Sequence, residues 1–343
     1  MKTRIIEQFN FMPKSKIKAG EGKPFGLYPF FTSSDVKRLF LDDYVYNDEL
    51  IIIGTGGNPS CNYYNGKFSA STDNFVLKSK GIIKTKYLYY FLRHNNFSLL
   101  AHGFHGISIK HLGKEYLSNL EIYVNPKYSQ DNVVNNLDGI NSSLSNENHK
   151  LRIINELIKS QFIELFTNKN YNKISIKECV DLSIETAKSK FNKEDEIKYI
   201  DISSLDNKQN EIIGFTEYKL ENAPSRAQQH VIKNDILIST VRPNLKNIAK
   251  VRHPDENLVG SSGYCVLRPR TCNSEYLLYS VLTDDFTDAM VNLATGISYP
   301  AIHDEDVLNY KIIDAPKDKQ NEFSIFVQQC DKLKFIYHWR YFL

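Results

Sequence analysis

The chain has 343 residues, of which 41% are hydrophobic and 24% are charged, and its formal net charge is +3. This length allows two ordinary domains, and the balance of residues is typical of a folded globular protein. The longest apolar runs, such as residues 50–53, are far shorter than the roughly 20 residues of a membrane-spanning helix. The N-terminus is basic but has no apolar core or cleavage site of a signal peptide, so we expect a cytoplasmic protein.

The five cysteines argue against two kinds of small stabilised domain. They are scattered, odd in number and never spaced as Cys-x-x-Cys. This pattern argues against a disulfide framework and a structural zinc site, and it suits a reducing cytoplasm. The small net charge means that any DNA-binding surface must be a local basic one.

An internal repeat organises the chain. Four short motifs recur in the same order at an offset of 187 to 190 residues: NDELII at 47–52 with NDILI at 234–238, YLYYFL at 87–92 with YLLYSVL at 276–282, GIS at 106–108 with GIS at 296–298, and LEI at 120–122 with YKI at 310–312. Each motif alone is weak, but their common order and offset indicate a duplicated structural unit.

Each unit predicts the same series of elements. Short strands with turn signals come first, at residues 50–53 and 236–240. A helix rich in Tyr and Leu follows, then the Gly-Ile-Ser turn, another strand, and a proline that precedes a long helix. The predicted fold class is therefore α+β, with two similar mixed α/β domains. The first unit shows no counterpart of residues 174–182 ahead of Gly26.

The two long helices carry apolar residues at alternating spacings of three and four. Such a repeat, sustained from Pro126 to about Phe166, predicts a coiled-coil seam. Roughly 37 residues at about 1.5 Å each would make a rod of about 55 Å. An apolar seam needs a partner, and the other long helix is the nearest one, which predicts an intramolecular antiparallel coiled coil and a pseudo-twofold molecule. The predicted seam consists of Leu137, Ile140, Leu144, Leu151, Ile154, Ile158, Phe323, Phe326 and Leu333.

This arrangement resembles the DNA-specificity subunit of type I restriction-modification systems. The resemblance covers almost the whole chain and is carried by GLYPFFTSS at 26–34, VIKNDILIST at 231–240, GISYPAI at 296–302 and the helix seam. It implies a target-recognition domain at 1–127, a spacer helix at 128–168, a second target-recognition domain at 169–317 and a second spacer helix at 318–343. Each domain would read one half of a bipartite, asymmetric site in double-stranded DNA.

The resemblance also implies partners and a division of chemistry. The helices would dock two modification (methyltransferase) subunits and set a spacing of roughly 16 base pairs at about 3.4 Å each. A restriction (motor-nuclease) subunit would join through the complex. We expect no cofactor in this chain, because S-adenosylmethionine, ATP and Mg would be bound by those partner subunits.

Candidate DNA-binding residues are those whose side chains suit base edges or phosphates. In the first unit, the glycine-rich loop after residue 53 offers amide, hydroxyl and basic groups, although it could equally be a hairpin tip without a ligand. In the second unit the corresponding stretch is basic, the alternative being a solvated strand. The remaining candidates are basic runs, which are as often merely solvated, and one histidine near the Gly-Ile-Ser turn. The candidates are Thr55, Asn58, Tyr63, Tyr64, Lys67, Arg242, Asn244, Lys246, Lys250, Arg252, Lys14, Lys16, Lys23, Arg226 and His105.

The sequence does not predict a catalytic or metal centre. His102, His105 and His111 lie close together, but no cysteine or clustered carboxylate accompanies them, so we interpret the segment as a conformational turn. Asn58-Pro59-Ser60-Cys61 only partly matches the motif with which adenine methyltransferases hold a flipped base. No phosphate-binding loop or nuclease motif is present. We therefore expect a non-catalytic specificity subunit, with a duplicated protein-interaction scaffold as the alternative.

Overall fold

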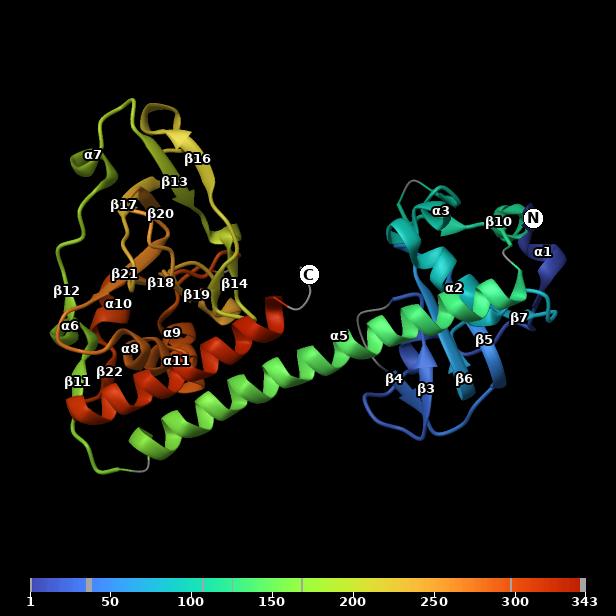
Figure 1. Ribbon diagram of the computed structural model, residues 1–343, viewed down its shortest axis with the longest axis horizontal. Coiled ribbons are helices and arrows are strands. Elements are labelled where there is room, and N and C mark those ends of the chain that lie inside the picture. Colours follow the sequence, from blue (N-terminus) through green and yellow to red (C-terminus); the bar gives the residue numbers. More distant parts are fainter. Residues whose placement is uncertain are drawn as a thin grey trace. The chain divides into compact units, whose positions relative to one another are not determined.

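The computed structural model describes residues 2–34, 39–106, 108–124, 126–167, 169–296 and 298–339 (Figure 1). The chain divides into two compact units, Met1–Asn146 and Glu147–Leu343. Ile107 and Ile297 of the two Gly-Ile-Ser motifs lie outside the described residues. Among the described residues, no helix is both long enough and apolar enough to cross a membrane.

Unit 1 is built on a six-stranded sheet in the order β2-β7-β5-β6-β3-β4, with α2 packed against β5 and β6. Two further strand pairs, β1 with β10 and β8 with β9, form separate two-stranded sheets. The elements are β1 (Lys2–Arg4), α1 (Ile5–Gln8), β2 (Phe9–Phe11), β3 (Tyr28–Phe31), β4 (Leu39–Leu41), β5 (Tyr46–Gly54), β6 (Cys61–Ala70), β7 (Asn74–Ser79), α2 (Thr85–Arg93), α3 (Ser98–Ala101), β8 (Phe104–His105), β9 (His111–Leu112), α4 (Lys114–Asn119) and β10 (Glu121–Tyr123).

Helix α5 (Lys127–Phe162) begins in unit 1 and ends in unit 2, which contains two four-stranded sheets. Their orders are β12-β21-β18-β19 and β16-β13-β20-β17. The elements are β11 (Lys173–Ser175), α6 (Ile176–Cys179), β12 (Val180–Asp181), α7 (Ala187–Lys190), β13 (Glu196–Ile200), β14 (Leu205–Asp206), β15 (Glu211–Ile212), β16 (Thr216–Lys219), β17 (Ala227–His230), β18 (Ile236–Ser239), β19 (Ile248–Lys250), β20 (Leu258–Ser261), β21 (Tyr264–Pro269), α8 (Ser274–Val281), α9 (Asp284–Leu293), α10 (Asp304–Asn309), β22 (Lys311–Ile313) and α11 (Lys317–Trp339).

The duplication predicted from the sequence is confirmed by the strand topology. The antiparallel order β2-β7-β5-β6 in unit 1 recurs as β12-β21-β18-β19 in unit 2. At the start of each unit a short strand pairs with the strand that precedes the long helix, Thr3 opposite Ile122 and Ile174 opposite Ile312. Residues 3–11 are thus the counterpart of residues 174–182. The expectation that unit 1 lacks such a segment was wrong, because only the strand–helix–strand geometry is repeated and not the residues.

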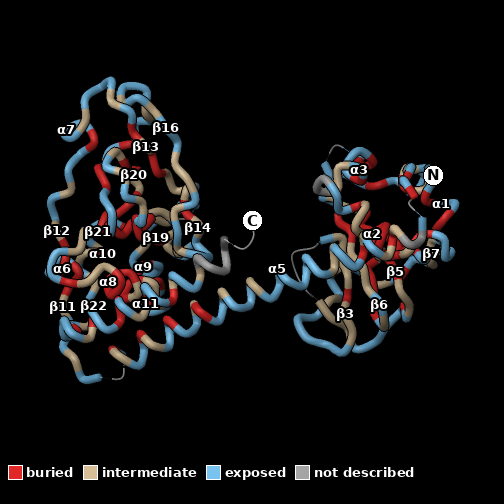
Figure 2. The backbone as a smooth tube through the Cα atoms, viewed as in Figure 1, coloured by how far each residue is buried: buried red, intermediate tan, exposed pale blue. Residues whose placement is uncertain are grey.

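The central strand of each unit is buried on both faces (Figure 2). Leu50, Ile51, Ile52 and Ile53 are all 0% exposed. Alternate side chains point to opposite faces of a strand, so Ile51 and Ile53 enter the core beneath α2, while Leu50 and Ile52 enter a second cluster around Phe68. A continuous apolar run, rather than an alternating one, is what a strand covered on both faces requires.

Near the start of each long helix, one buried glutamine makes the same hydrogen bond to the body of the unit. Gln130 Oε1 accepts a hydrogen bond from the Lys84 backbone N–H at 2.9 Å, just before α2. Gln320 Oε1 accepts the equivalent bond from the Asn273 backbone N–H at 2.8 Å, just before α8. Because both backbone donors precede a helix and have no partner within it, each glutamine satisfies a polar group that would otherwise be costly to bury.

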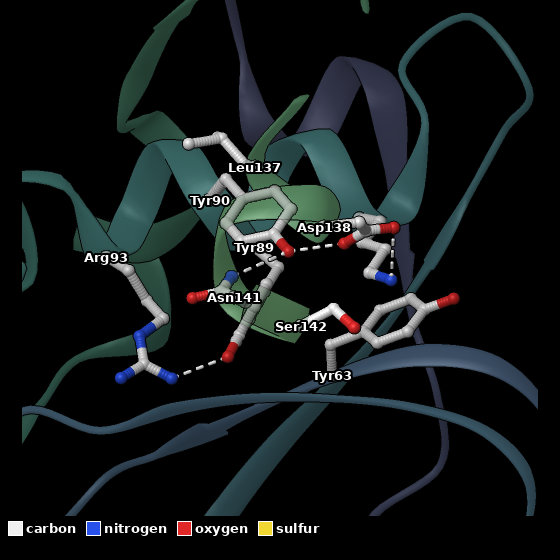
Figure 3. Close-up of a pocket in the computed structure, with 9 residues that line it drawn as sticks. Tyr63, Tyr89, Tyr90, Arg93, Leu137, Asp138, Asn141 and Ser142 are labelled. Atoms are coloured by element: carbon white, nitrogen blue, oxygen red, sulfur yellow. Dashed lines mark hydrogen bonds and ion pairs between the residues drawn. The ribbon is translucent and has the colours of Figure 1, made fainter. Parts of the chain in front are cut away.

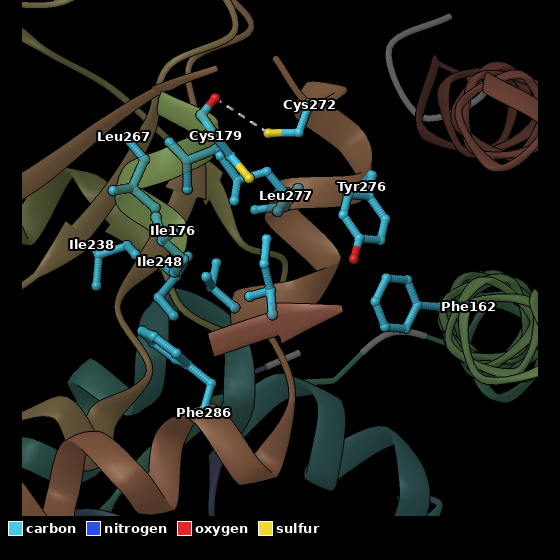
Figure 4. Close-up of a cluster of buried hydrophobic side chains, with 14 of the residues drawn as sticks. Phe162, Ile176, Cys179, Ile238, Ile248, Leu267, Cys272, Tyr276, Leu277 and Phe286 are labelled. Atoms are coloured by element: carbon cyan, nitrogen blue, oxygen red, sulfur yellow. Dashed lines mark hydrogen bonds between the residues drawn. The ribbon is translucent and has the colours of Figure 1, made fainter. Parts of the chain in front are cut away.

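In unit 2, the C-terminal half of α5 packs antiparallel to α11 through aromatic side chains (Figure 1). The centroid of the Phe162 ring lies 5.4 Å from that of the Phe323 ring. It lies 5.9 Å from the centroid of the Tyr276 ring of α8 (Figure 4). A π-helical turn, Ile163–Thr167, follows α5, and its wider turn keeps Phe166 on the same face as Phe162. The buried stripe steps by four residues, at positions 154, 158, 162 and 166.

The predicted seam is correct for this half only. Ile154, Ile158 and Phe323 are buried, whereas Leu151 and Phe326 are half-buried. In the unit 1 part of α5, Ile140 and Leu144 are exposed to solvent, and Leu137 instead borders a hollow beside α2. Leu333 of α11 is also exposed. The seam was predicted too long because Ile140 and Leu144 belong to unit 1, whereas α11 packs against the part of α5 that belongs to unit 2.

Replacing Phe323 by alanine should destabilise the protein by about 3–5 kcal/mol, because this side chain is fully buried among the rings of Phe162, Phe166 and Tyr279. Leu333→Ala on the same helix is the control and should change stability by less than about 1 kcal/mol, since Leu333 is 46% exposed. Urea unfolding followed by circular dichroism measures both. Equal losses for the two variants would contradict the observed packing.

Two glycines should respond to alanine in opposite directions. Gly139 lies within α5 with nothing within 4 Å of an added Cβ, so Gly139→Ala should stabilise the protein by about 0.5–1 kcal/mol. Gly106 has φ +145°, and its added Cβ would lie 2.3 Å from the Ile109 carbonyl oxygen, so Gly106→Ala should destabilise. Thermal midpoints test this pair, and a shift of the same sign for both would refute it.

Candidate nucleic-acid interface

In unit 1, two loops from distant parts of the sequence are joined at one end of the sheet. The turn between β5 and β6 pairs with β9: the Leu112 N–H donates to Thr55 O at 2.9 Å, and the Gly57 N–H donates to Lys110 O at 3.1 Å. The exposed side chains of this joined region are Asn58, His105, Lys110 and His111, which we call loop surface 1. It presents amide, imidazole and ammonium groups, which suit base edges and phosphates.

The glycines of this turn serve its close packing. A Cβ on Gly54 would lie 2.2 Å from Ser60 Oγ, and Ser60 Oγ in turn donates to Ser33 O at 3.0 Å. Gly57 has φ +82°, a conformation that costs other residues free energy. The glycine-rich stretch is thus explained by the turn geometry itself, whether or not its backbone also approaches a phosphate.

Unit 2 joins its loops in the same way. The Ile302 N–H donates to Thr240 O at 2.9 Å, and the Arg242 N–H donates to Pro300 O at 2.7 Å. A third segment joins them, because Thr240 N–H donates to Gly263 O and Ser262 N–H donates to Arg226 O. The exposed side chains gathered here are Arg226, Arg242, Asn244 and Tyr299, which we call loop surface 2.

Corresponding hydrogen bonds identify the equivalent residues of the two surfaces. Thr55 corresponds to Thr240 and Gly57 to Arg242, while residues 109–112 correspond to residues 299–302. The isolated bridges between Gly56 and His111 and between Val241 and Ala301 match as well. The two surfaces therefore share one backbone framework and differ in the side chains that it presents.

The N-terminal basic run passes the same end of the unit 1 sheet. The Thr55 N–H donates to Asp73 O, and the Thr72 N–H donates to Ile17 O, both at 2.9 Å. Lys14 and Lys16 are exposed beside this turn, with the Lys14 ammonium 5.1 Å from the Phe75 ring centroid. Lys23 instead forms an ion pair of 2.7 Å with Asp42 next to β4. Lys14 and Lys16 thus extend loop surface 1, whereas Lys23 does not.

Tyr63, Tyr64 and Lys67 lie on strand β6 and not in the loop, which corrects their predicted placement. Thr55 does lie in the turn, but its side chain is buried and only its backbone joins the loops. Tyr64 packs against Phe31 and Phe68 in the core. Lys67 lies six residues along β6 from the turn, about 20 Å at the rise of a strand. The sequence showed these residues following a glycine-rich stretch but did not show where the strand resumed.

Tyr63 borders a hollow of about 640 Å³ between β6, α2 and the unit 1 part of α5 (Figure 3). Its hydroxyl donates to Glu49 Oε1 at 2.8 Å, and burial raises its pKa. The cations at this hollow already have partners: Lys86 pairs with Asp138 at 2.7 Å, and Arg93 lies 5.3 Å from the Tyr89 ring centroid. We assign no ligand to it.

Three basic candidates of unit 2 are held by internal ion pairs. Lys250 is buried and pairs with Glu275 at 2.6 Å; burial lowers its pKa, and Glu275 opposes that effect. Arg252 bridges Glu275 and Asp331 of α11, at 3.5 and 3.1 Å. Lys246 pairs with Asp284 at 2.5 Å. Lys250 and Arg252 attach β19 to α8 and α11, so we withdraw them from the proposed interface.

The sequence did not point to Lys110 and Tyr299 as candidates, and it pointed to His111 only as a possible metal ligand. The repeated Gly-Ile-Ser motif could have pointed to them, because they lie within three residues after it in their units. In the described part of the chain, no three His, Cys, Asp or Glu side chains are grouped to hold a metal ion. His105 and His111 lie opposite each other in the β8–β9 register.

Comparisons with known proteins show what the chain is similar to. Residues 4–159 match the family described as Type I restriction modification DNA specificity domain. The chain is 21% identical over 368 residues to the Type I restriction enzyme EcoDI specificity subunit of Escherichia coli, covering 96% of this chain and 80% of that protein. It is 21% identical over 350 residues to the MjaVIII specificity subunit of Methanocaldococcus jannaschii, covering 90% and 80%.

A solved structure shares the fold over nearly the whole chain. The crystal structure of the Type-I restriction-modification system S subunit from M. genitalium superposes with a TM-score of 0.64 at 18% identity, covering 98% of this chain and 91% of that one. By these matches the chain is similar to DNA-specificity subunits of type I restriction-modification systems, and it shares the fold of one of them.

Proposed function

We propose that this chain is the DNA-recognition subunit of a type I restriction-modification complex, with loop surfaces 1 and 2 each reading one half of a bipartite, asymmetric site. The observation that carries the proposal is the duplication of one backbone framework with different exposed side chains. The backbone geometry that the two units share would present each surface to DNA in the same manner, and the different side chains would select different bases.

The chain is non-catalytic in this proposal. The relatives are named specificity subunits. Adenine methylation and ATP-driven cleavage belong to partner subunits, which bind S-adenosylmethionine, ATP and Mg. In this proposal, the contacts between this chain and DNA determine at which sequence the partner subunits methylate or cleave.

The long helices are the proposed docking sites for two modification subunits. Exposed aliphatic side chains line α5 at Ile140, Leu144, Ile153 and Leu157, and Leu333 is exposed on α11. Large apolar side chains exposed along a helix are typical of a surface that a partner covers. Arg252, two residues after β19 of the sheet that carries loop surface 2, pairs with Asp331 of α11.

Co-expression with a modification subunit should yield a methylated, two-part, asymmetric DNA motif, read by long-read sequencing of the host genome. Exchanging the unit 1 loop residues for those of a relative should change one half of the motif and leave the other half unchanged. Unaltered methylation in cells where the complex is shown to assemble would reject the proposal in favour of an interaction scaffold.

The double variant Lys14→Ala/Lys16→Ala should weaken DNA binding uniformly across sequences. Because each phosphate contact releases about one counterion, the slope of log K against log [salt] should become shallower by about 2. Lys67→Ala is the matched control and should leave the slope unchanged, because Lys67 lies far along β6 from the loop surface. Equal effects in both variants would show that the DNA follows a different face of unit 1.

A further inference from the structure

Arg242 has an unusual backbone conformation that its surroundings enforce. Its φ of 52° and ψ of 63° lie in the left-handed region, which is disfavoured for any residue with a Cβ. The Arg242 N–H donates to Pro300 O at 2.7 Å, and its carbonyl accepts from the Leu245 N–H at 2.9 Å. A non-glycine residue held in such a conformation often marks a functional position.

The Arg242 side chain contacts one aromatic ring and has no further partner in the part of the chain that the structure describes. Its guanidinium carbon lies 4.5 Å from the centroid of the Tyr299 ring, and Tyr299 is 69% exposed. Among the described residues, the guanidinium forms no ion pair and no side-chain hydrogen bond. Contact with an aromatic ring limits the orientations of the guanidinium while its N–H groups stay available for a ligand.

The duplication shows that this pair is not needed to build the loop. At the equivalent positions unit 1 has Gly57 and Ile109, yet the hydrogen bond from residue 57 to Lys110 O forms in the same way. Glycine is the residue that suits the left-handed conformation of this position. Arg242 therefore adopts a backbone conformation that is less favourable for it than for glycine. The aromatic partner, Tyr299, is present in unit 2 beside the arginine, whereas unit 1 has Ile109 at that position beside Gly57.

We propose that Arg242, held against Tyr299, reads a guanine in the half-site recognised by unit 2. A guanidinium with a fixed orientation can donate two hydrogen bonds to O6 and N7 of guanine in the major groove, a pairing that no other base offers. Tyr299 is a positioning residue in this scheme, since it orients the guanidinium. The inference rests on the proposed function and names one base that loop surface 2 selects.

The test uses the full chain, co-expressed with a modification subunit, and the methylated motif as its readout. Arg242→Gly is the informative variant, because glycine preserves the backbone conformation and removes only the side chain. In the unit 2 half-site, one position occupied by guanine should relax, with discrimination there falling by roughly tenfold to a hundredfold. The unit 1 half-site should keep its sequence and serves as the internal control for folding and assembly.

Substitutions of Tyr299 test the positioning role. Tyr299→Phe keeps a ring beneath the guanidinium and should preserve the motif, whereas Tyr299→Ala should relax the same position that Arg242→Gly relaxes. Relaxation at a different position would contradict the pairing of these two residues.

Two results would overturn the inference while the proposed function stands. One is a unit 2 half-site without any guanine–cytosine pair. The other is weaker methylation by Arg242→Gly with an unchanged motif, which would show that Arg242 contacts a phosphate. Absence of any two-part motif with the unchanged chain would instead reject the proposed function, and this inference with it.

Discussion

The backbone pairing between the central hairpin turn and the Gly-Ile-Ser segment is the constraint on which both units depend. It joins residues separated by more than fifty positions in the chain, and it uses only main-chain groups. Because main-chain hydrogen bonds are indifferent to side-chain identity, the framework can stay the same while the exposed residues change. Gly106 and Gly296 have positive φ and bring the segment back toward the turn, which explains why this glycine is shared by the two units.

The charged residues of unit 2 divide into two groups with different roles. Lys250, Arg252 and Glu275 form a partly buried network that attaches strand β19 to α8 and, through Asp331, to α11. Breaking one partner of a buried pair leaves an uncompensated charge, so such a network fixes geometry. Arg226 and Arg242 lie outside it and are exposed at the loops. A basic side chain that is already paired with an internal carboxylate is not available to neutralise a phosphate. Lys250 and Arg252 therefore have a structural role, whereas Arg226 and Arg242 are candidates for DNA binding.

Helix α5 belongs to both units and meets different partners along its length. Its first half is attached to α2 through Gln130, Asp138 and Asn141, all of which form polar contacts. Its second half packs through phenylalanine rings against α8 and α11. The apolar side chains that neither arrangement covers remain exposed on the helix, and they form the surface that we propose for the modification subunits. The four-part division of the chain into recognition domains and spacer helices stays a prediction.

By itself, the sequence determined the duplication, the long helices and the α+β class, because these depend on local patterns: recurring motifs, helical spacing and apolar runs. It also pointed to the turn at Arg242. Tertiary structure alone decided which basic residues are free, since Lys250 and Arg252 find their carboxylate partners on helices far along the chain. It likewise decided that Ile140 and Leu144 are exposed, that Tyr63 and Lys67 lie on a strand, and that Tyr299 meets Arg242. These facts depend on contacts between distant residues, and no local pattern in one chain encodes them.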